Sequence, residues 1–180
     1  MTVLLLTGTC GSGKSTIADL ISKREGWTRV CEDEVWKATF QNDRGHFGTD
    51  EHRRKRQQVH RIVFDRILAA IELRHNVAVD ATVHEAPPES YQEYVAFFGS
   101  NNIRWRLKVL HPRLDVAIER DRLRTEWHAG AERVRQLYVK FTFEVFPAEC
   151  FVDTTDQNPE ETLEAVLLGI NSQSVSNGIG

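Results

Sequence analysis

The sequence predicts a three-layer α/β domain, in which helices cover both faces of a parallel β-sheet. The main observation is that short apolar segments alternate along the chain with longer segments of helical periodicity. The length of 180 residues suits one domain with a single sizeable core. The sequence shows no internal repeat and no low-complexity segment that would indicate another architecture.

Five segments are expected to be strands: Val3–Leu6, Thr28–Cys31, Val77–Asp80, Trp105–Leu110 and Cys150–Asp153. Six segments are expected to be helices: Ser15–Lys23, about residues 52–73, Ser90–Phe98, Leu114–Leu123, Ala131–Glu144 and Pro159–Leu168. The last helix has good start chemistry, with Asn158 as N-cap, Pro159 at the first position and Glu161 at the third. We place the domain at residues 1–170 and expect residues 171–180, rich in Ser, Asn and Gly, to form a flexible tail.

Composition and charge argue against several classes of protein. Hydrophobic residues make up 41% of the chain, charged residues 27%, and the net charge of −3 gives no overall attraction to nucleic acid or to an anionic membrane. No apolar segment approaches the ~20 residues of a membrane helix, and the N-terminus lacks the features of a secretory signal. Cys10, Cys31 and Cys150 are too widely spaced for a disulfide framework or a zinc site. We therefore expect a cytoplasmic protein.

The segment GTCGSGKST, residues 8–16, matches the phosphate-binding pattern G-x-x-x-x-G-K-[ST] and lies between a predicted strand and a predicted helix. Its glycines allow successive backbone N–H groups to face phosphate oxygens, and the start of the following helix favours anions. Lys14 is expected to reach the β- and γ-phosphates, and the Ser15 hydroxyl to bind Mg²⁺. The residues expected to bind the phosphates are Gly8, Thr9, Cys10, Gly11, Ser12, Gly13, Lys14, Ser15 and Thr16.

Asp33 follows the second predicted strand, and ligands of open parallel sheets bind at the carboxyl ends of the strands. A carboxylate at this place can accept the proton of an attacking hydroxyl group, or orient that group, as phosphoryl transfer to an alcohol requires. Asp33 is therefore a candidate catalytic residue. The alternative is that Asp33 only caps a helix beginning near Val35.

Asp80 ends the third predicted strand and resembles the carboxylate of a Walker B strand, which binds Mg²⁺ directly or through water. Asp80 and Thr82 could instead hold the acceptor, because the neighbouring strand carries Asp33. The sequence leaves the choice of Asp80 between metal and acceptor open. His84 and Glu85 on the next loop are weaker candidates for acceptor binding.

An arginine cluster follows the fourth predicted strand. Arg120 and Arg124 share one face of the predicted helix, whereas Arg122 lies roughly opposite. The guanidinium group matches the oxygens of a transferring phosphoryl group, so the first two are candidate catalytic residues. The alternative is an exposed basic helix whose charge is offset by acidic neighbours.

These motifs, in this order and followed by the segment ECFVDTT, resemble the small P-loop kinases. This group of AAA-type P-loop phosphotransferases holds gluconate-, shikimate- and chloramphenicol-kinase-like enzymes and the phage-type polynucleotide 5′-kinases. The resemblance covers nearly the whole chain. It implies a P-loop NTPase fold with sheet order 2-3-1-4-5, a helical lid over about residues 120–136 and an acceptor-binding segment over about residues 34–75.

The same resemblance implies that Asp33 activates the acceptor hydroxyl and that the VDTTDQNP segment lies near adenine, which points to ATP with Mg²⁺. The sequence contains no N-K-x-D-like signature for guanine. In the polynucleotide kinases of this group, an arginine that grips a nucleic-acid phosphate follows the acceptor carboxylate by three residues. Here that position is Trp36, which could stack on an acceptor instead.

The basic segment His52–Arg61 favours an anionic acceptor, unless it is simply a solvated helix face. We predict an ATP-dependent kinase of a small-molecule hydroxyl group, with no membrane and no obligate protein partner. A polynucleotide 5′-hydroxyl kinase is the alternative. A regulatory ATPase or switch is disfavoured by the short chain and the lid-like arginines, and a nucleoside-monophosphate kinase would need no base such as Asp33.

Overall fold

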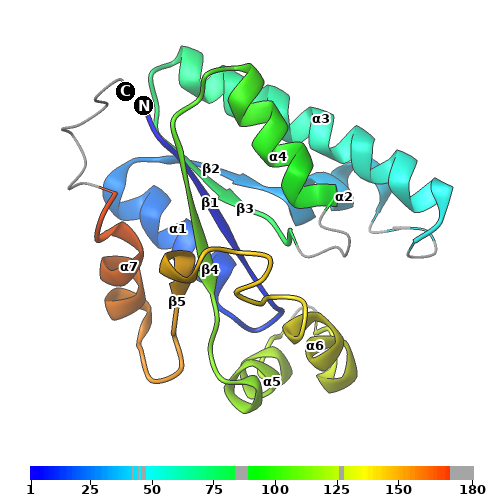
Figure 1. Cartoon of the computed structure of the whole chain (residues 1–180), viewed down its shortest axis with the longest axis vertical. Coiled ribbons are helices and arrows are strands. Elements are labelled where there is room, and N and C mark those ends of the chain that lie inside the picture. The colour runs from blue at the N-terminus through cyan, green and yellow to red at the C-terminus, as the bar shows by residue number, and fades with distance from the viewer. Residues whose placement is uncertain (42, 44, 46–47, 84–88, 126–127, 171–180) are drawn as a thin grey trace.

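A computed structural model describes residues 1–41, 43, 45, 48–83, 89–125 and 128–170. Its centre is a five-stranded sheet in the order β2-β3-β1-β4-β5, with all strands parallel (Figure 1). The predicted sheet and its predicted order are therefore confirmed. The strands are β1 (Val3–Gly8), β2 (Thr28–Cys31), β3 (Val77–Asp80), β4 (Trp105–Leu110) and β5 (Phe151–Val152).

Helices cover both faces of this sheet (Figure 1). Alternate residues of β1 face opposite layers, because successive side chains of a strand point to opposite sides. Val3 and Leu5 belong to a core cluster shared with α3 (Asp50–Glu72) and α4 (Glu89–Ser100), whereas Leu4 and Leu6 belong to a second cluster shared with α1 (Lys14–Glu25) and α7 (Pro159–Leu167). The helices are α1 (Lys14–Glu25), α2 (Glu32–Phe40), α3 (Asp50–Glu72), α4 (Glu89–Ser100), α5 (Leu114–Arg122), α6 (Ala131–Tyr138) and α7 (Pro159–Leu167), with a 3₁₀ turn, η1, at Ala148–Cys150.

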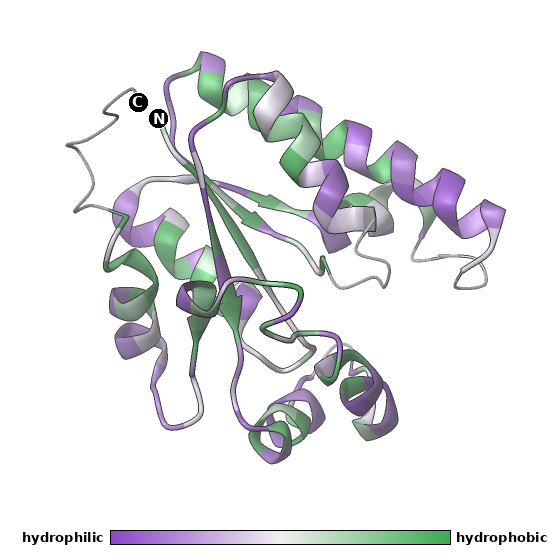
Figure 2. Ribbon diagram, in the orientation of Figure 1, coloured by the Kyte–Doolittle hydropathy of each residue, from purple (hydrophilic) through white to green (hydrophobic). Residues whose placement is uncertain are grey.

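The hydropathy of the elements follows this layering. The strands are mainly hydrophobic, whereas hydrophilic residues dominate the end of α3 that extends beyond the sheet (Figure 2). The predicted start of α7 is confirmed, since the Asn158 side chain accepts from the Glu161 N–H and the Glu161 carboxylate accepts from the Asn158 N–H. Within the part of the chain that the structure describes, no helix is both long and apolar enough to cross a membrane.

Several predicted boundaries differ from the structure. The helix expected to reach residue 144 ends at Tyr138, because Phe141 and Phe146 are buried and the chain turns to place them in the core. The helix expected to begin near Val35 begins at Glu32, directly after β2. Strand β5 is confined to Phe151–Val152, and Cys150 belongs to η1. The predicted tail, residues 171–180, lies outside the described residues.

The strand register determines which groups meet at the carboxyl edge of the sheet. Leu6 of β1 pairs with Asp80 of β3, and Asp80 pairs in turn with Cys31 of β2. The segments that follow these three strands therefore start side by side. They are the predicted phosphate loop, the segment with Thr82, and α2 with Asp33.

Candidate active site

The phosphate loop connects β1 to α1. Gly13, at the N-cap position of α1, has a φ of +97°, a left-handed conformation that glycine adopts without a steric penalty. The Lys14 Nζ donates to the backbone oxygens of Gly8 at 2.8 Å and Thr9 at 2.9 Å. Lys14 is 7% exposed, so these contacts fix a buried positive charge beside the loop and the helix N-terminus.

The phosphate loop packs directly against α5 and α6, which we call the α5–α6 arm (residues 114–138). A Cβ atom at Gly11, whose φ is +76°, would lie 2.0 Å from the backbone oxygen of Ala117 in α5. The Thr9 hydroxyl donates to the backbone oxygen of Val134 in α6 at 3.4 Å. The absence of a side chain at Gly11 therefore allows the arm to approach the loop backbone.

Replacing Gly11 with alanine is expected to destabilise the protein by about 3 kcal/mol, because the new methyl group meets a backbone carbonyl and the φ is positive. The matched control is Gly26→Ala, which also has a positive φ but no atom within 4 Å of the added Cβ. Its expected cost is about 1 kcal/mol. Urea unfolding of the two variants measures the difference, and equal costs would contradict the close packing of the arm on the loop.

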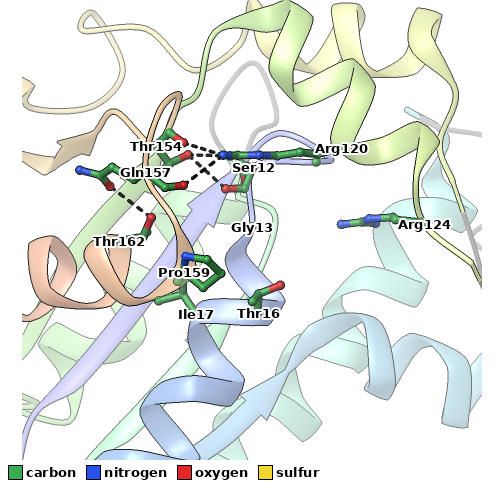
Figure 3. A pocket seen from close by; sticks show the side chains of 11 residues that line it. Ser12, Gly13, Thr16, Ile17, Arg120, Arg124, Thr154, Gln157, Pro159 and Thr162 are labelled. Atoms are coloured by element: carbon green, nitrogen blue, oxygen red, sulfur yellow. Dashed lines mark hydrogen bonds between the residues drawn. The ribbon is translucent and has the colours of Figure 1, made fainter.

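A pocket of about 270 Å³ opens beside the phosphate loop (Figure 3). Its walls are residues 11–13 of the loop, the first turns of α1, the arginines Arg120 and Arg124, and the segment leading into α7. In the first turn of α7, the Thr162 hydroxyl donates to the side-chain oxygen of Gln157 in that segment at 3.1 Å. The loop glycines, two arginines and the VDTTDQNP segment thus meet in one cavity.

The structure separates the two predicted arginines. Arg120 lies on α5, and its guanidinium donates to the Thr154 hydroxyl at 3.2 Å and to the backbone oxygens of Thr154, Thr155 and Gln157 at 2.7, 3.4 and 3.4 Å. These bonds tie α5 to the segment before α7 and form one wall of the pocket. Arg124 lies beyond the end of α5 at Arg122, so the predicted shared helix face is not formed.

Arg124 points toward Gly13 and Thr16 across the pocket (Figure 3). Its side chain is 35% exposed, and its Nη1 lies 4.0 Å from the Oδ1 of the buried Asp121. Of the predicted pair, Arg124 is therefore the arginine whose side chain faces the phosphate loop.

Asp80 lies at the end of β3 and is 5% exposed. Burial raises the pKa of the Asp80 carboxyl; the charge of Lys14 and a hydrogen bond from Ser15 oppose this rise, and the charge of Asp33 adds to it. The Asp80 Oδ2 also accepts from the Cys31 thiol at 3.6 Å. Burial, followed by the charge of Asp80, raises the pKa of Cys31 to about 12, so the thiol stays protonated at neutral pH.

The residues around Asp80 fit a Mg²⁺ ion. A hydroxyl group and a carboxylate lie in hydrogen-bond contact beside Lys14, and such hard oxygen ligands bind Mg²⁺ together with substrate phosphates. Among the described residues, no group of three or more His, Cys, Asp or Glu side chains could hold a metal by itself. The donor set therefore suits a metal that is bound jointly with a nucleotide.

Asp33 lies in the first turn of α2 and is exposed. Cys31 occupies the N-cap position of α2 and makes no side-chain cap, so Asp33 is not the helix cap that the sequence offered as its alternative role. Its charge adds to the raised pKa values of Asp80 and Cys31, so the Asp33 carboxylate lies within electrostatic range of both groups. Thr82 is half-buried two residues after β3, while His84 and Glu85 lie outside the described residues.

Trp36 is 1% exposed and belongs to the core. Its ring stacks on His52 with centroids 5.9 Å apart, and its Nε1 donates to the Glu32 Oε1 at 3.3 Å. An acceptor could reach this ring only if the packing of Trp36 on His52 opened. The predicted contact of Trp36 with the acceptor stays a prediction, and the structure gives the ring a place in the core.

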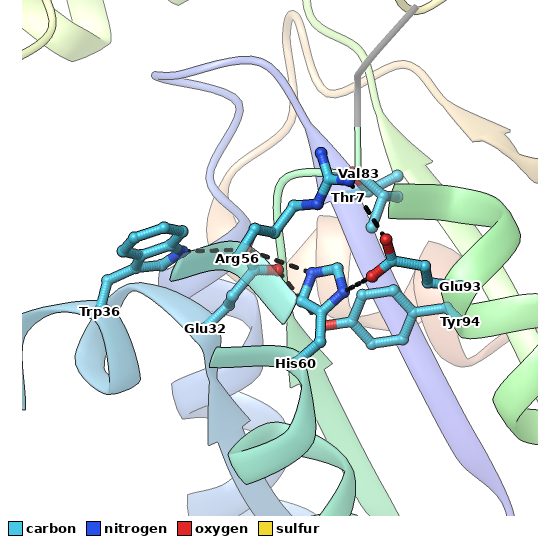
Figure 4. Close-up of polar contacts among 8 residues, drawn as sticks. All are labelled: Thr7, Glu32, Trp36, Arg56, His60, Val83, Glu93 and Tyr94. Carbon is cyan, nitrogen blue, oxygen red and sulfur yellow. Dashed lines mark hydrogen bonds and ion pairs between the residues drawn. The ribbon is translucent and has the colours of Figure 1, made fainter. Parts of the chain in front are cut away.

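Glu32 belongs to a buried polar network that the sequence analysis missed (Figure 4). Tyr94 donates to the Glu32 Oε2 at 3.2 Å, and the His60 Nε2 lies 3.8 Å from the Glu32 Oε1. On the other side, the His60 Nδ1 bonds closely to Glu93, which also accepts from Arg56 at 3.2 Å. The network joins α2, α3 and α4 beside the carboxyl edge of the sheet.

The charge of His60 is stabilised by this network. Burial disfavours the imidazolium, but the close contact with Glu32, the hydrogen bond to Glu93 and the charges of both carboxylates outweigh burial and raise the pKa of His60 to about 9. Arg56, the hydroxyl of Tyr94 and the Nε1–H of Trp36 also contact these two carboxylates. His60 is therefore an imidazolium at neutral pH.

This pKa predicts a pH-dependent stability. Because the folded pKa of His60 exceeds the ordinary histidine value of 6.5, its contribution to stability is complete below pH 6.5 and is lost as the pH rises through about 9. The expected loss is about 3 kcal/mol. Urea unfolding from pH 6 to pH 9.5 measures it, and His60→Gln should remove the slope while His75→Gln, at an exposed position, keeps it. A wild-type slope in His60→Gln would contradict the assignment.

The basic segment His52–Arg61 divides between two faces of α3. His52, Arg56 and His60 recur every four residues and are buried, facing the neighbouring elements. On the outer face, Arg53 pairs with Asp50 at 2.7 Å. Lys55 pairs with Asp43 and Glu51, each at 2.8 Å. Much of the charge of this segment is therefore balanced within the protein.

A family model described as AAA domain matches residues 3–142 of this chain. Among curated protein sequences, none matches it. Among solved structures, a gluconokinase from Sinorhizobium meliloti 1021 is similar with a TM-score of 0.68 and 17% sequence identity, over 94% of this chain and 91% of the gluconokinase. The tunicamycin resistance protein of Deinococcus radiodurans is similar with a TM-score of 0.69 and 16% identity, over 94% of this chain and 95% of that protein.

A chain of the Pnkp1/Rnl/Hen1 RNA repair complex is similar with a TM-score of 0.64 and 22% identity, over 81% of this chain and 46% of that one. At these identities the likeness concerns the fold. The strand order, the helices on both faces and the loop between β1 and α1 are shared features of this architecture. The chain, matched over most of its length, therefore belongs to the AAA domain family and has the fold of P-loop kinases.

Proposed function

We propose that this protein is an ATP-dependent kinase that transfers the γ-phosphoryl group to a hydroxyl group of a small molecule. The observation that carries this proposal is the meeting of three groups at one edge of the sheet. They are the phosphate loop with its buried Lys14, Asp80 at the end of β3, and Asp33 directly after β2. This arrangement holds a nucleotide phosphate beside a carboxylate that can receive a proton.

Each group has a role in in-line phosphoryl transfer. The loop N–H groups and Lys14 bind the phosphates, and Arg124 faces the same loop across the pocket and can stabilise the charge of the transferring group. Asp33 orients the acceptor hydroxyl and accepts its proton. Ser15 and Asp80, together with the nucleotide, would hold Mg²⁺, which would neutralise charge on the phosphates.

The nucleotide base is assigned to the Arg120 side of the pocket. The segment from Thr154 to Pro159 lines this side of the pocket, and Arg120 fixes its backbone. We assign ATP, since the fold is that of P-loop kinases, which generally use ATP. Arg120 thus has a structural role at the base site in this proposal, and Arg124 has the role at the phosphates.

A small-molecule acceptor is favoured over a polynucleotide by the basic segment of α3. His52, Arg56 and His60 are buried, and Lys55 pairs with acidic side chains. Cations that are buried or already paired within the protein bind a polynucleotide weakly, because polynucleotide binding relies on cations that replace the counterions of the phosphates. The similarity to the RNA repair complex keeps the polynucleotide kinase as the second candidate.

The test is a transfer assay with γ-labelled ATP, Mg²⁺ and two pools of acceptors. One pool contains oligonucleotides with a 5′-hydroxyl group, and the other contains sugars, sugar acids, nucleosides and antibiotics. We expect label on a member of the second pool. Label on the oligonucleotides would select the alternative, and release of free phosphate unaffected by either pool would favour a regulatory ATPase.

A further inference from the structure

Asp121 is a buried carboxylate in the last turn of α5. It is 1% exposed, and its Oδ2 accepts from the backbone N–H groups of Ala129 and Gly130, each at 2.9 Å. Gly130 is the N-cap residue of α6 and provides no side-chain cap. Asp121 therefore links the end of α5 to the start of α6 by accepting hydrogen bonds from two backbone N–H groups.

The second oxygen of this carboxylate is directed at Arg124. The Asp121 Oδ1 is buried and makes no hydrogen bond among the described residues, and the Arg124 Nη1 lies 4.0 Å away. A buried carboxylate of this kind is costly unless a positive charge offsets it. At 4.0 Å the pair attract each other without a close hydrogen bond, so the donors of Arg124 remain able to bind phosphate oxygens.

The contacts between the α5–α6 arm and the phosphate loop fix the position of Asp121 relative to the loop. Ala117 lies one turn before Asp121 on α5, and its backbone oxygen packs on Gly11. The backbone N–H of Asp121 itself would lie 3.1 Å from a Cβ at Gly11. The Asp121 residue, whose carboxylate links α5 to α6, therefore lies directly beside the phosphate loop.

We propose that Asp121 is a positioning residue, which acts through Arg124 on the bound nucleotide. Its carboxylate links the end of α5 to the start of α6 and attracts the Arg124 guanidinium. These two interactions hold Arg124 opposite Gly13 and Thr16. This inference rests on the proposed function, since it assumes that the phosphates of ATP occupy the loop. Asp121 itself touches no substrate.

The test is calorimetric titration of the full chain with ATP and Mg²⁺, which requires no acceptor. Arg124→Ala and Asp121→Ala are each expected to weaken ATP binding about tenfold, as loss of a charge-assisted hydrogen bond does. The double variant should bind ATP no more weakly than Arg124→Ala alone, because both changes remove the same contact. Asp121→Asn should restore only part of the affinity, to about threefold below the wild type, since its amide oxygen can accept the same two N–H groups but its side chain no longer attracts Arg124.

Glu119→Ala is the matched control, because Glu119 is an exposed acid on the same helix that pairs with Arg122, and wild-type affinity is expected. Additive losses in the double variant, or wild-type affinity in Asp121→Ala, would overturn the inference. If Asp121→Ala does not fold, Asp121→Glu takes its place in the same cycle, because it keeps the charge and displaces the carboxylate. If the wild type and Lys14→Ala bind ATP equally weakly, the proposed function fails as well. If the wild type binds ATP much more tightly than Lys14→Ala, a negative result for Asp121 contradicts only the role of Asp121.

Discussion

Replacing Lys14 with alanine is expected to reduce phosphoryl transfer by about a thousandfold and to weaken ATP binding strongly. Lys14 is 7% exposed, and its ammonium group is held between the backbone oxygens of Gly8 and Thr9, so its charge has a fixed position at the loop. A preorganised charge in such a site stabilises the transferring phosphoryl group far more than a solvated lysine would.

The matched control is Lys23→Ala, because Lys23 lies in the last turn of the same helix and is exposed. Transfer of γ-label to the acceptor found in the pool assay measures the rate, and calorimetry measures ATP binding. Thermal unfolding of both variants tests for loss of structure. A Lys14→Ala variant that stays folded and transfers label at more than a tenth of the wild-type rate would contradict the proposed role.

The sequence allowed the sheet and the phosphate loop to be predicted because both are encoded locally. Each strand is a short apolar segment, and the loop is a contiguous motif whose glycines and lysine fix its own geometry. The sheet order followed from the resemblance to P-loop kinases, and the register that brings Asp80 beside Cys31 became visible only in the structure. The closeness of Asp33 to the Asp80 site follows from that register.

The polar network around His60 could not be predicted, because its members come from three helices that are distant in the sequence. One signal was present: His52, Arg56 and His60 recur every four residues, on the same side of α3 as Val59 and Val63. Basic residues in line with an apolar face indicate buried cations, which need acidic partners. The partners, Glu32 and Glu93, carry no local pattern that would identify them.

Arg120 and Arg124 show the same limit. Their spacing predicted a shared helix face, but α5 ends at Arg122, so the two side chains take separate places along one pocket. The carbonyl groups that bind Arg120 belong to residues more than thirty positions later in the chain. Backbone acceptors of this kind have no signature in a sequence, because every residue carries one.

Replacing Asp33 with asparagine is expected to reduce transfer by about a hundredfold or more and to leave ATP binding within about twofold of the wild type. The carboxylate lies on α2, outside the nucleotide pocket, so the loop contacts and the arginines remain in place. The amide retains the shape of the side chain but cannot accept the proton of the attacking hydroxyl group. Loss of transfer with intact binding therefore separates a base from a binding residue.

Glu34→Gln provides the control, because it removes one negative charge from the same turn of α2, where Glu34 pairs with Arg29. Both variants lose the same charge near the helix N-terminus, so a general electrostatic effect would lower their rates equally. If Asp33→Asn transfers label to the identified acceptor at nearly the wild-type rate, another group must receive the proton. If it loses ATP binding together with transfer, Asp33 acts on the nucleotide side through Asp80, whose pKa its charge helps to raise.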